Sequence, residues 1–558
     1  MGKAGRRKQK KEDARTLKRK EVVRAVNLSP SLTGGLLAAI VLFFGLIRLR
    51  LLNFPLERDE GEFAYAGQLI LHGIAPYRLC YTMKLPGTAA AYAFFLAVFG
   101  QTPAGVHLGL LVVNSATIVL LYFLAARLFG RLAGVVAAAS FALLSIQPSV
   151  LGFAAHATQF VLLPAVGGIL LLLKALESGR LSLSFYSGVA LGLAFLMKQP
   201  GVVFVVFALL YLMHRLWKRP LPWRTLASRS GILVAGFTLP LVFTALVLWK
   251  THVFGQFWFW TFSYARQYAT ISTFSGGLQN FWSTGLPVVS SAVFVWLIAL
   301  AGIVVMFWDP EIRHHIVFTL GFLAFSFAAV CPGLYFREHY FVLLLPAVSL
   351  LCAVAVGSTT TMLLKSRTNA MWALLPVFVF VLAAGVSVVG QSAVFFEDDP
   401  LTVCRKMYGY NPFPEAVQVS DFLKSHSREG DRVAVIGSEP EIYFYSGLRS
   451  ATGYIYMYPL MEVQPFASVM QQQMIAEIET SRPEFLIFVS AGSSWLKKDD
   501  SDTTVFSWGS RYSQSNYDLI GDVDILKQGT EYHWSNAATF NSHSENRILL
   551  YKRKAPPS

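Results

Sequence analysis

Long apolar runs separated by short polar segments dominate the first 390 residues of the chain. Runs that approach or exceed about 18 apolar residues are typical of helices that cross a membrane. The pattern predicts a polytopic α-helical membrane protein with about eleven crossings, eleven to thirteen being the expected range. The predicted crossings cover residues 32–52, 106–126, 132–150, 162–173, 183–197, 201–213, 232–249, 286–308, 316–330, 340–356 and 372–389.

The apolar run at residues 85–99 is shorter and opens with Pro86-Gly87. At that length we expect it to be re-entrant or to lie at the membrane surface. With this run excluded from the crossings, the basic loop at residues 215–229, which has no acidic residue, falls on the same side as the N-terminus. Positive charge is retained in the cytoplasm. This topology therefore predicts a cytoplasmic N-terminus and an extracytoplasmic C-terminal segment.

The pattern changes after about residue 390, where charged residues return and β-branched runs alternate with helical segments. Helices are expected at residues 416–426, 440–446 and 466–479, and strands at 432–437, 484–489 and 548–551. This order predicts a small extracytoplasmic α/β domain with a partly parallel sheet over residues 391–558. No GxGxxG or GxxxxGK[ST] motif follows a strand, so no nucleotide site is expected.

Charge is sparse and unevenly distributed. The chain has 558 residues, 14% of them charged, and a net charge of +15. Much of the excess lies in a basic tail at residues 1–31, which we expect to be cytoplasmic and to touch anionic lipid headgroups rather than nucleic acid. The run at 32–52 is too long for a cleaved signal peptide and lacks a small-residue cleavage site, so it is expected to remain as an anchor.

An acidic turn, Asp59-Glu60-Gly61-Glu62, follows the first crossing at the start of a predicted outer loop over residues 53–85. A charge near hydrocarbon is costly unless it is paired, hydrated or used. The predicted topology places further charged or titratable residues on the same face, namely Lys84, His156, Lys198 and Arg337. Because all of these residues are predicted to lie on one face, the sequence favours chemistry at the outer face of the membrane.

An acid cluster beside several separate cations suits a transfer reaction with an anionic leaving group. A carboxylate can take the proton from an attacking hydroxyl, and Lys or Arg can hold a phosphate as it gains charge. Each residue also has a structural interpretation. The acids could cap a surface helix at residues 61–71, and Lys84 and Lys198 could reach headgroups along their stems. Arg337 could pair with Glu338, and His156 could be a hydrogen-bonded structural residue.

Four short motifs follow one another in a particular order along the membrane part of the chain. Asp59-Glu60 is followed by Tyr65-Ala66 and by Gly73-x-x-Pro76-Tyr77. Lys84-Leu85-Pro86-Gly87, Lys198-Gln199-Pro200-Gly201 and Arg337-Glu338-His339-Tyr340 with Pro346 come later. Over roughly residues 32–390 this ordered set resembles the GT-C superfamily of membrane glycosyltransferases. It looks most like the bacterial branch of family 39, which includes protein O-mannosyltransferase-like enzymes and the aminoarabinose transferase of lipid A.

The resemblance implies a GT-C-like catalytic domain over residues 32–390 in the bacterial inner membrane, using a sugar on polyprenyl phosphate as donor. Asp59 would be the general base, and Glu60 would orient the acceptor or the loop. Lys84, Lys198 and Arg337 would bind the lipid phosphate, and the reaction would be a direct displacement with inversion. Further candidate substrate contacts are Glu62, Tyr65, His156, Gln159, His339 and Tyr340.

The chain departs from the family pattern in two places. The Lys84 motif lacks the first proline of a Lys-Pro-Pro element, and Gln159 stands where many relatives carry a second Asp. A divalent metal therefore stays an open question, as does the acceptor, which could be a glycan, a glycolipid or a protein. The main alternative function is a flippase or transporter for a lipid-linked sugar. That alternative predicts charges in mid-span and inverted halves around a midplane site, whereas the cations here lie at the ends of spans.

Overall fold

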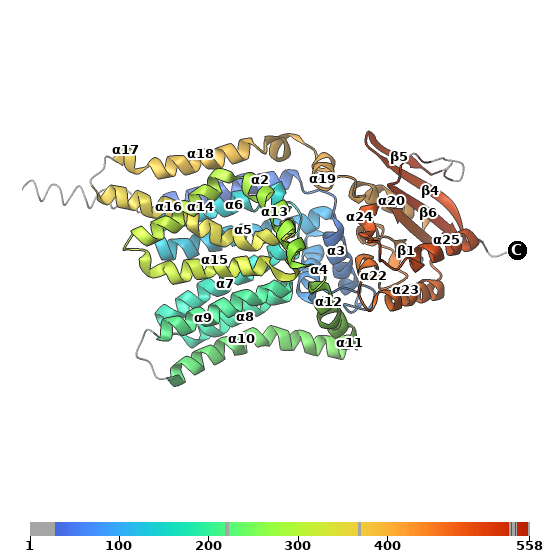
Figure 1. Ribbon diagram of the computed structural model, residues 1–558, viewed down its shortest axis with the longest axis horizontal. Coiled ribbons are helices and arrows are strands. Elements are labelled where there is room, and N and C mark those ends of the chain that lie inside the picture. The colour runs from blue at the N-terminus through green and yellow to red at the C-terminus, as the bar shows by residue number, and fades with distance from the viewer. Residues whose placement is uncertain are drawn as a thin grey trace, which may run out of the picture.

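The structure, a computed structural model, describes residues 28–217, 223–366, 370–534, 537, 542 and 544–555. Figure 1 shows a bundle of long helices at one end and a smaller domain with a β-sheet at the other. This arrangement confirms the predicted fold class, a polytopic helical membrane protein with a small α/β domain at its C-terminal end. The predicted basic tail lies outside the described residues except for residues 28–31, as do Lys218 and Arg219 of the basic loop.

Seven helices in the described part of the chain are long and apolar enough to cross a membrane. They are α2 (Pro30–Arg50), α5 (Pro103–Phe129), α7 (Ala157–Ser178), α9 (Val202–Trp217), α10 (Trp223–Lys250), α15 (Ile316–Val330) and α16 (Leu345–Lys365), with short helical turns extending α9, α15 and α16 at their N-terminal ends. The pair α13 (Phe274–Ser290) and α14 (Val293–Trp308) adds an eighth candidate, bent by 99° at its break.

The remaining three predicted crossings fall on shorter apolar helices. These are α6 (Arg131–Leu144), α8 (Leu181–Met197) and α18 (Leu375–Val389), and Figure 1 shows α8 and α18 running alongside the long helices. The run expected to be re-entrant or superficial forms α4 (Pro86–Phe99), which has 14 residues. At 1.5 Å per residue it is about 21 Å long, short of the roughly 30 Å of a bilayer core.

Local sequence explains where several of these helices begin and end. The side chains of Ser29 and Thr102 accept N–H bonds from the first turns of α2 and α5, and a proline follows each as the first helical residue. Gly130 alone joins α5 to α6, with a φ of 95° that favours glycine. This tight turn makes the two helices antiparallel neighbours.

Close helix contacts in the bundle depend on small residues. A Cβ atom on Gly188 of α8 would lie 2.0 Å from the carbonyl oxygen of Leu233 in α10, and one on Gly236 would lie 2.1 Å from that of Phe185. Such backbone approach is typical of helix pairs in membranes, where packing replaces the hydrophobic effect as the driving force. At the centre of the bundle, α16 is buried along its apolar length, whereas α2 and α10 are largely exposed on the outside.

The C-terminal domain contains a six-stranded sheet of order β2-β1-β3-β6-β4-β5. Its strands are β1 (Arg432–Ile436), β2 (Arg449–Ser450), β3 (Phe485–Ser490), β4 (Tyr517–Leu526), β5 (Gly529–His533) and β6 (Arg547–Arg553). β1 runs parallel to β2 and β3, and the other pairs are antiparallel. The three predicted strands correspond to β1, β3 and β6, so the partly parallel sheet was predicted correctly.

The helices of this domain are α19 (Pro400–Tyr408), α20 (Phe413–His426), α21 (Glu441–Ser446), α22 (Tyr458–Met461), α23 (Ala467–Ser481), α24 (Gly492–Trp495) and α25 (Thr504–Asn516). The predicted helices correspond to α20, α21 and α23. Strands β4 and β5 were not predicted, because Asp522 and Asp524 make the sequence of β4 look like a loop. Both aspartates are buried, and Arg547 of the neighbouring β6 pairs with Asp522.

The two parts of the molecule meet at α3 (Arg58–Leu71), the helix that follows the first crossing. Gly61 lies against α21 so closely that a Cβ atom there would be 2.5 Å from the backbone nitrogen of Glu441. The hydroxyl of Tyr65 accepts the N–H of Ser450, and the hydroxyl of Tyr445 accepts that of Leu56. The C-terminal domain is therefore docked directly on the acidic loop.

Candidate active site

A cavity of about 380 Å³ lies where the ends of the bundle helices meet the C-terminal domain. Eight residues predicted from the sequence line it, contributed by segments far apart in the chain. They are Asp59, Glu62, Lys84, His156, Lys198, Arg337, His339 and Tyr340. The structure thus brings together the acid cluster and all three predicted cations.

Three of these residues stand immediately before a helical segment at the same end of the bundle. His156 precedes α7, Lys198 precedes the 3-10 turn η2 (Gln199–Gly201), and Arg337 precedes the 3-10 helix η6 (Glu338–Leu344). A helical segment begins directly after each of these residues, so their side chains lie at the N-terminal ends of helices and not in the middle of a membrane-spanning helix. This placement agrees with the sequence argument against charges at a midplane site.

The acidic turn is held rigidly by a capping box. The Glu57 side chain accepts the N–H of Glu60 at 2.9 Å, and the Glu60 side chain accepts the N–H of Glu57 at 3.2 Å. Helix α3 therefore begins at Arg58, three residues before the helix expected from the sequence.

Glu60 points away from the cavity and is fully buried. Its Oε1 accepts the N–H of Ala155 at 2.6 Å and lies 3.1 Å from Nε2 of His107. Of the two roles expected for Glu60, this geometry suits orientation of the loop, because the carboxylate ties α3 to the segment that carries His156.

Lys84 is paired with two carboxylates of α3. Its ammonium group donates to Oδ1 of Asp59 at 2.7 Å and to Oε2 of Glu62 at 2.6 Å. Burial alone would lower the pKa of Lys84, but the two carboxylates outweigh it and raise the pKa. Burial likewise acts to raise the pKa of Asp59, and Lys84 and His156 outweigh it, holding that pKa well below its usual range. Asp59 is therefore ionised at neutral pH.

The other two cations have no carboxylate partner among the described residues. The ammonium of Lys198 lies 4.2 Å from the ring centre of Tyr340, and the guanidinium of Arg337 lies 5.8 Å from that of Tyr335. Burial, reinforced by Lys84 and Arg337, lowers the pKa of Lys198 to about 7, although Asp59 opposes the shift. An anion entering the cavity would find these two cations available.

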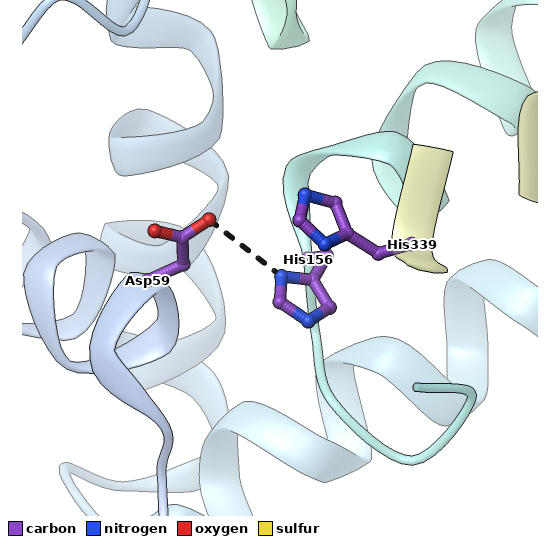
Figure 2. A group of neighbouring side chains, drawn as sticks. All are labelled: Asp59, His156 and His339. Atoms are coloured by element: carbon purple, nitrogen blue, oxygen red, sulfur yellow. Dashed lines mark ion pairs between the residues drawn. The ribbon is translucent and has the colours of Figure 1, made fainter. Parts of the chain in front are cut away.

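His156 and His339 stack face to face beside Asp59 (Figure 2). Their ring centres are 4.0 Å apart and the planes differ by 8°. Nδ1 of His156 lies 3.5 Å from Glu57 and 3.8 Å from Oδ2 of Asp59. Burial acts to lower the pKa of His156, but Glu57 and Asp59 outweigh it and raise the pKa.

Two predicted substrate contacts lie outside the cavity lining. Tyr65 is buried under the C-terminal domain against Tyr443, and Gln159 accepts a hydrogen bond from Asn114 inside the bundle. Neither side chain reaches the cavity, because both point into packed interfaces. The contacts seen for Tyr65 and Gln159 are structural.

A family model for dolichyl-phosphate-mannose-protein mannosyltransferases matches residues 84–249. ArnT from Cupriavidus metallidurans bound to undecaprenyl phosphate has a similar structure, with a TM-score of 0.59 and 14% identity, covering 94% of this chain and 98% of ArnT. The archaeal oligosaccharyltransferase AglB from Archaeoglobus fulgidus, in complex with an inhibitory peptide and a dolichol-phosphate, matches with a TM-score of 0.53 and 11% identity. That match covers 91% of this chain and 75% of AglB. No curated protein sequence matches the chain.

The chain has the fold of ArnT and AglB. This is the fold that the ordered motifs at Asp59, Lys84, Lys198 and Arg337 led us to expect. The match to ArnT covers nearly the whole of both chains, so the shared fold includes the C-terminal domain as well as the helix bundle.

Several residues that line the cavity were not expected from the sequence. Glu57 stands just before the predicted acidic turn, and burial raises its pKa to about 7. Tyr456, Tyr458 and Glu462 come from the C-terminal domain. The run Tyr454-Ile455-Tyr456-Met457-Tyr458, in which tyrosines alternate with apolar residues, is the signal that could have identified this wall.

Asp59, His156 and His339 also have the composition of a metal site. One ligand atom from each lies within 4.8 Å of the others, and two imidazoles with a carboxylate are a common ligand set for zinc. Both ring nitrogens of His156 and Nδ1 of His339 are buried without a hydrogen-bond partner in the described part of the chain. These three residues therefore fit a divalent transition metal, which would displace any proton on His156.

Proposed function

We propose that the protein transfers a sugar from a polyprenyl-phosphate donor to an acceptor hydroxyl at the non-cytoplasmic face of a membrane. The observation that carries this proposal is the single cavity in which Asp59 faces the uncommitted cations Lys198 and Arg337. The fold adds support, because the similar structures of ArnT and AglB are described with undecaprenyl phosphate and a dolichol-phosphate.

The phosphate of the donor binds to Lys198 and Arg337. Both side chains line the cavity at the N-terminal ends of helical segments. A donor whose phosphate binds there could keep its lipid tail in the bilayer. Charged donors at this position stabilise the phosphate as it gains charge on departure. Lys84 was expected to share this task, but its ammonium is engaged by Asp59 and Glu62. We assign it instead to holding the two carboxylates in place.

Asp59 accepts the proton of the attacking hydroxyl. The acceptor oxygen forms a bond to the anomeric carbon while the bond from that carbon to the phosphate oxygen breaks, and polyprenyl phosphate leaves with the electron pair. A single displacement of this kind inverts the anomeric configuration. The low pKa of Asp59 keeps the carboxylate ionised and ready as acceptor, although it makes the base weak. Glu60 positions Asp59 through the capping box and Ala155.

A divalent metal held by Asp59, His156 and His339 would supply positive charge within the cavity, and Asp59 would then serve as a metal ligand instead of as the base. One similar structure, that of the Archaeoglobus fulgidus oligosaccharyltransferase, is a complex with Zn and sulfate. It matches this chain with a TM-score of 0.54 and 13% identity, and the match covers 89% of this chain and 73% of that one. Glu57 and Glu62 also line the cavity and could accept hydrogen bonds from substrate hydroxyls.

The proposal includes a division of the chain and an orientation. Residues 32–390 form the catalytic membrane domain, and residues 391–558 form an extracytoplasmic domain that closes the cavity with Tyr456, Tyr458 and Glu462. The N-terminus lies in the cytoplasm of a bacterial cell, and the protein resides in its inner membrane. The acceptor is a glycan, a glycolipid or a protein.

The test separates binding from chemistry. Asp59→Asn should bind undecaprenyl phosphate like the wild type in native mass spectrometry but lose transfer by about 10²- to 10⁴-fold. Transfer is measured in membranes supplied with the radiolabelled polyprenyl-phosphate sugar fraction of the producing cells. Lys198→Met with Arg337→Met should lose binding of undecaprenyl phosphate. Lys365→Met is the matched control, because Lys365 pairs with exposed Glu311 away from the cavity.

Undiminished transfer by Asp59→Asn would refute the proposed base. Wild-type binding of undecaprenyl phosphate by the Lys198 and Arg337 double variant would refute the phosphate site. Movement of the labelled lipid between leaflets without a new glycosidic bond would instead establish a flippase.

A further inference from the structure

Gln199 lines the candidate active site between two of its charged segments. It follows Lys198 directly in the chain, and its side-chain Nε2 donates to the carbonyl oxygen of Met83 at 2.7 Å. Met83 in turn precedes Lys84, whose ammonium donates to Asp59 at 2.7 Å. The amide of Gln199 therefore bridges the segment that carries the proposed phosphate ligand Lys198 and the segment that carries the partner of the proposed base.

The backbone around Gln199 is held in a short, rigid turn. Gln199, Pro200 and Gly201 form η2, and the N–H of Gly201 donates to the carbonyl of Lys198 at 2.8 Å. A Cβ atom on Gly201 would lie 2.4 Å from the carbonyl oxygen of Ala194, so the turn packs backbone to backbone against α8. Pro200 also fixes its own φ. The fold therefore sets the position from which the Gln199 side chain leaves the chain.

The Met83 carbonyl decides which way the amide of Gln199 faces. A carbonyl oxygen can only accept a hydrogen bond, so it faces the NH2 group of the amide and not its oxygen. Oε1 of Gln199 consequently points away from Met83, and it accepts no hydrogen bond from any of the described residues. The side chain is half-buried in the cavity lining. Gln199 thus presents to the cavity an acceptor of fixed direction whose capacity is unused within the described residues.

The joint between α4 and α8 does not depend on this amide alone. The hydroxyl of Thr88, in the first turn of α4, donates to the carbonyl of Met197 at 2.8 Å. A Cβ atom on Gly87 would lie 2.4 Å from the carbonyl oxygen of Leu196, so the two segments are in direct backbone contact there as well. Thr88 lies outside the cavity lining, whereas Gln199 is part of it. The position of Gln199 therefore favours a task beyond joining the two helices.

An oxygen that only accepts hydrogen bonds selects its ligand by chemistry. Phosphate oxygens are acceptors too, so Oε1 would repel them, and they belong with the cations Lys198 and Arg337. Sugar hydroxyls, in contrast, donate. In a single displacement the anomeric carbon lies between the base and the departing phosphate oxygen, so the sugar occupies the space between Asp59 and Lys198. Because the donor sugar is bonded to the phosphate beside Lys198, its hydroxyls are the ligand donors nearest to Gln199.

We propose that Gln199 is a specificity-determining residue whose Oε1 accepts a hydrogen bond from a hydroxyl group of the transferred sugar. The Met83 carbonyl orients the amide before the substrate binds, which spares the cost of ordering a flexible side chain. This inference rests on the proposed transferase function and adds that the donor is recognised by its sugar as well as by its phosphate. A donor without that hydroxyl is disfavoured, because the acceptor oxygen is then left unpaired.

The test compares lipids with and without the sugar on the purified full chain in detergent. Native mass spectrometry gives the dissociation constants of undecaprenyl phosphate and of undecaprenyl phosphates that carry glucose, mannose, galactose or arabinose. The wild type should bind at least one sugar-bearing lipid more tightly than undecaprenyl phosphate. Gln199→Met keeps a side chain of similar length without the amide. It should weaken binding of that lipid about tenfold and bind undecaprenyl phosphate as the wild type does.

Thr88→Val is the matched control. It removes a hydrogen bond of the same joint between α4 and α8 without changing a residue of the cavity lining. It should therefore lower the midpoint of thermal unfolding but leave the preference for the sugar unchanged. An equal loss of that preference in Thr88→Val and Gln199→Met would show that the joint is responsible and would overturn the inference.

The same measurements separate this inference from the proposed function. An unchanged preference for the sugar in Gln199→Met would refute the contact while the proposed donor site stands. So would a wild type that binds undecaprenyl phosphate but none of the sugar-bearing lipids more tightly. Loss of undecaprenyl phosphate binding in Gln199→Met would show that Gln199 acts on the phosphate site, which also overturns the inference. Failure of the wild type to bind undecaprenyl phosphate would refute the donor of the proposed function itself.

Discussion

The ammonium nitrogen of Lys84 lies 2.7 Å from Oδ1 of Asp59, a residue 25 positions earlier in the chain. The pair is supported by Glu62, one helical turn after Asp59, which accepts a second bond from the same ammonium at 2.6 Å. Lys84 therefore balances the charge of the acidic helix, and Lys198 and Arg337 remain as the cations available to a substrate.

Loss of Lys84 should destabilise the fold. Lys84→Met leaves two carboxylates facing each other in a largely buried site, and breaking such a pair costs about 3 kcal/mol. Adding Glu62→Gln should restore part of this loss, giving a coupling energy of about 1–3 kcal/mol in unfolding experiments in detergent. The exposed pair Lys365 and Glu311 is the control and should couple by less than about 1 kcal/mol. Additive effects at Lys84 and Glu62 would contradict the arrangement.

Binding of polyprenyl phosphate should weaken as pH rises above about 7. Lys198 has a pKa of about 7 in the free protein because burial and neighbouring cations oppose its charge. Below that pH the ammonium is already charged. Above it, binding must take up a proton, so the Kd should rise by up to about tenfold per pH unit. Lys198→Arg stays charged throughout and should remove this dependence, while titration of the phosphate itself affects both proteins equally. Parallel pH profiles for the two proteins would exclude Lys198 from the phosphate site.

A methyl group at Gly61 should disturb the junction between the acidic helix and the C-terminal domain. In Gly61→Ala the new Cβ would meet the backbone of Glu441 at 2.5 Å, and overpacking of this kind costs about 1–3 kcal/mol. Displacement of α3 also moves Asp59, so transfer should fall by up to about 10²-fold. Gly35→Ala in α2 has open space around its Cβ and should keep full activity and stability. Equal midpoints of thermal unfolding for Gly61→Ala and Gly35→Ala would show that Gly61 and Glu441 are not in tight contact.

Zinc should stabilise the protein through the paired histidines. At a concentration 100 times its Kd, a ligand that binds only the folded state adds about 2.7 kcal/mol, which is measurable as a rise in the midpoint of thermal unfolding. His156→Gln and His339→Gln should each abolish that rise, since both rings contribute to the candidate metal site. His426→Gln, on the exposed face of α20, should retain it. An equal rise in all three variants would place zinc elsewhere.

The elements that could be predicted from the sequence are those whose physical constraint is local. Lipid forces each crossing segment to satisfy its backbone hydrogen bonds within a helix, so long apolar runs locate the helices of the bundle. Alternation of β-branched strands and helices likewise predicted β1, β3 and β6. It failed for β4, because the charge of Asp522 is balanced by Arg547 of β6, 25 residues later in the chain, and the sequence around β4 does not show this pairing.

Within the site, the sequence identified the residue types but not all of their directions. Asp59 and Glu60 are adjacent in sequence, yet successive residues of a helix point about 100° apart. Asp59 and Glu62, three residues apart, consequently share the face toward Lys84, while Glu60 turns toward Ala155. Tyr65 and Gln159 were candidates because they stand at positions of the family motifs, and packing directs both side chains elsewhere.

The sequence by itself determined that this chain is a helical membrane protein with an α/β domain, and that acids and cations stand at the mouths of its spans. Only the tertiary structure decided which of them share a cavity, that Lys84 is committed to the acids, and that tyrosines of the C-terminal domain complete the wall. The reason is physical: the local pattern of apolar residues fixes elements, whereas convergence of side chains depends on how distant elements pack and rotate against one another.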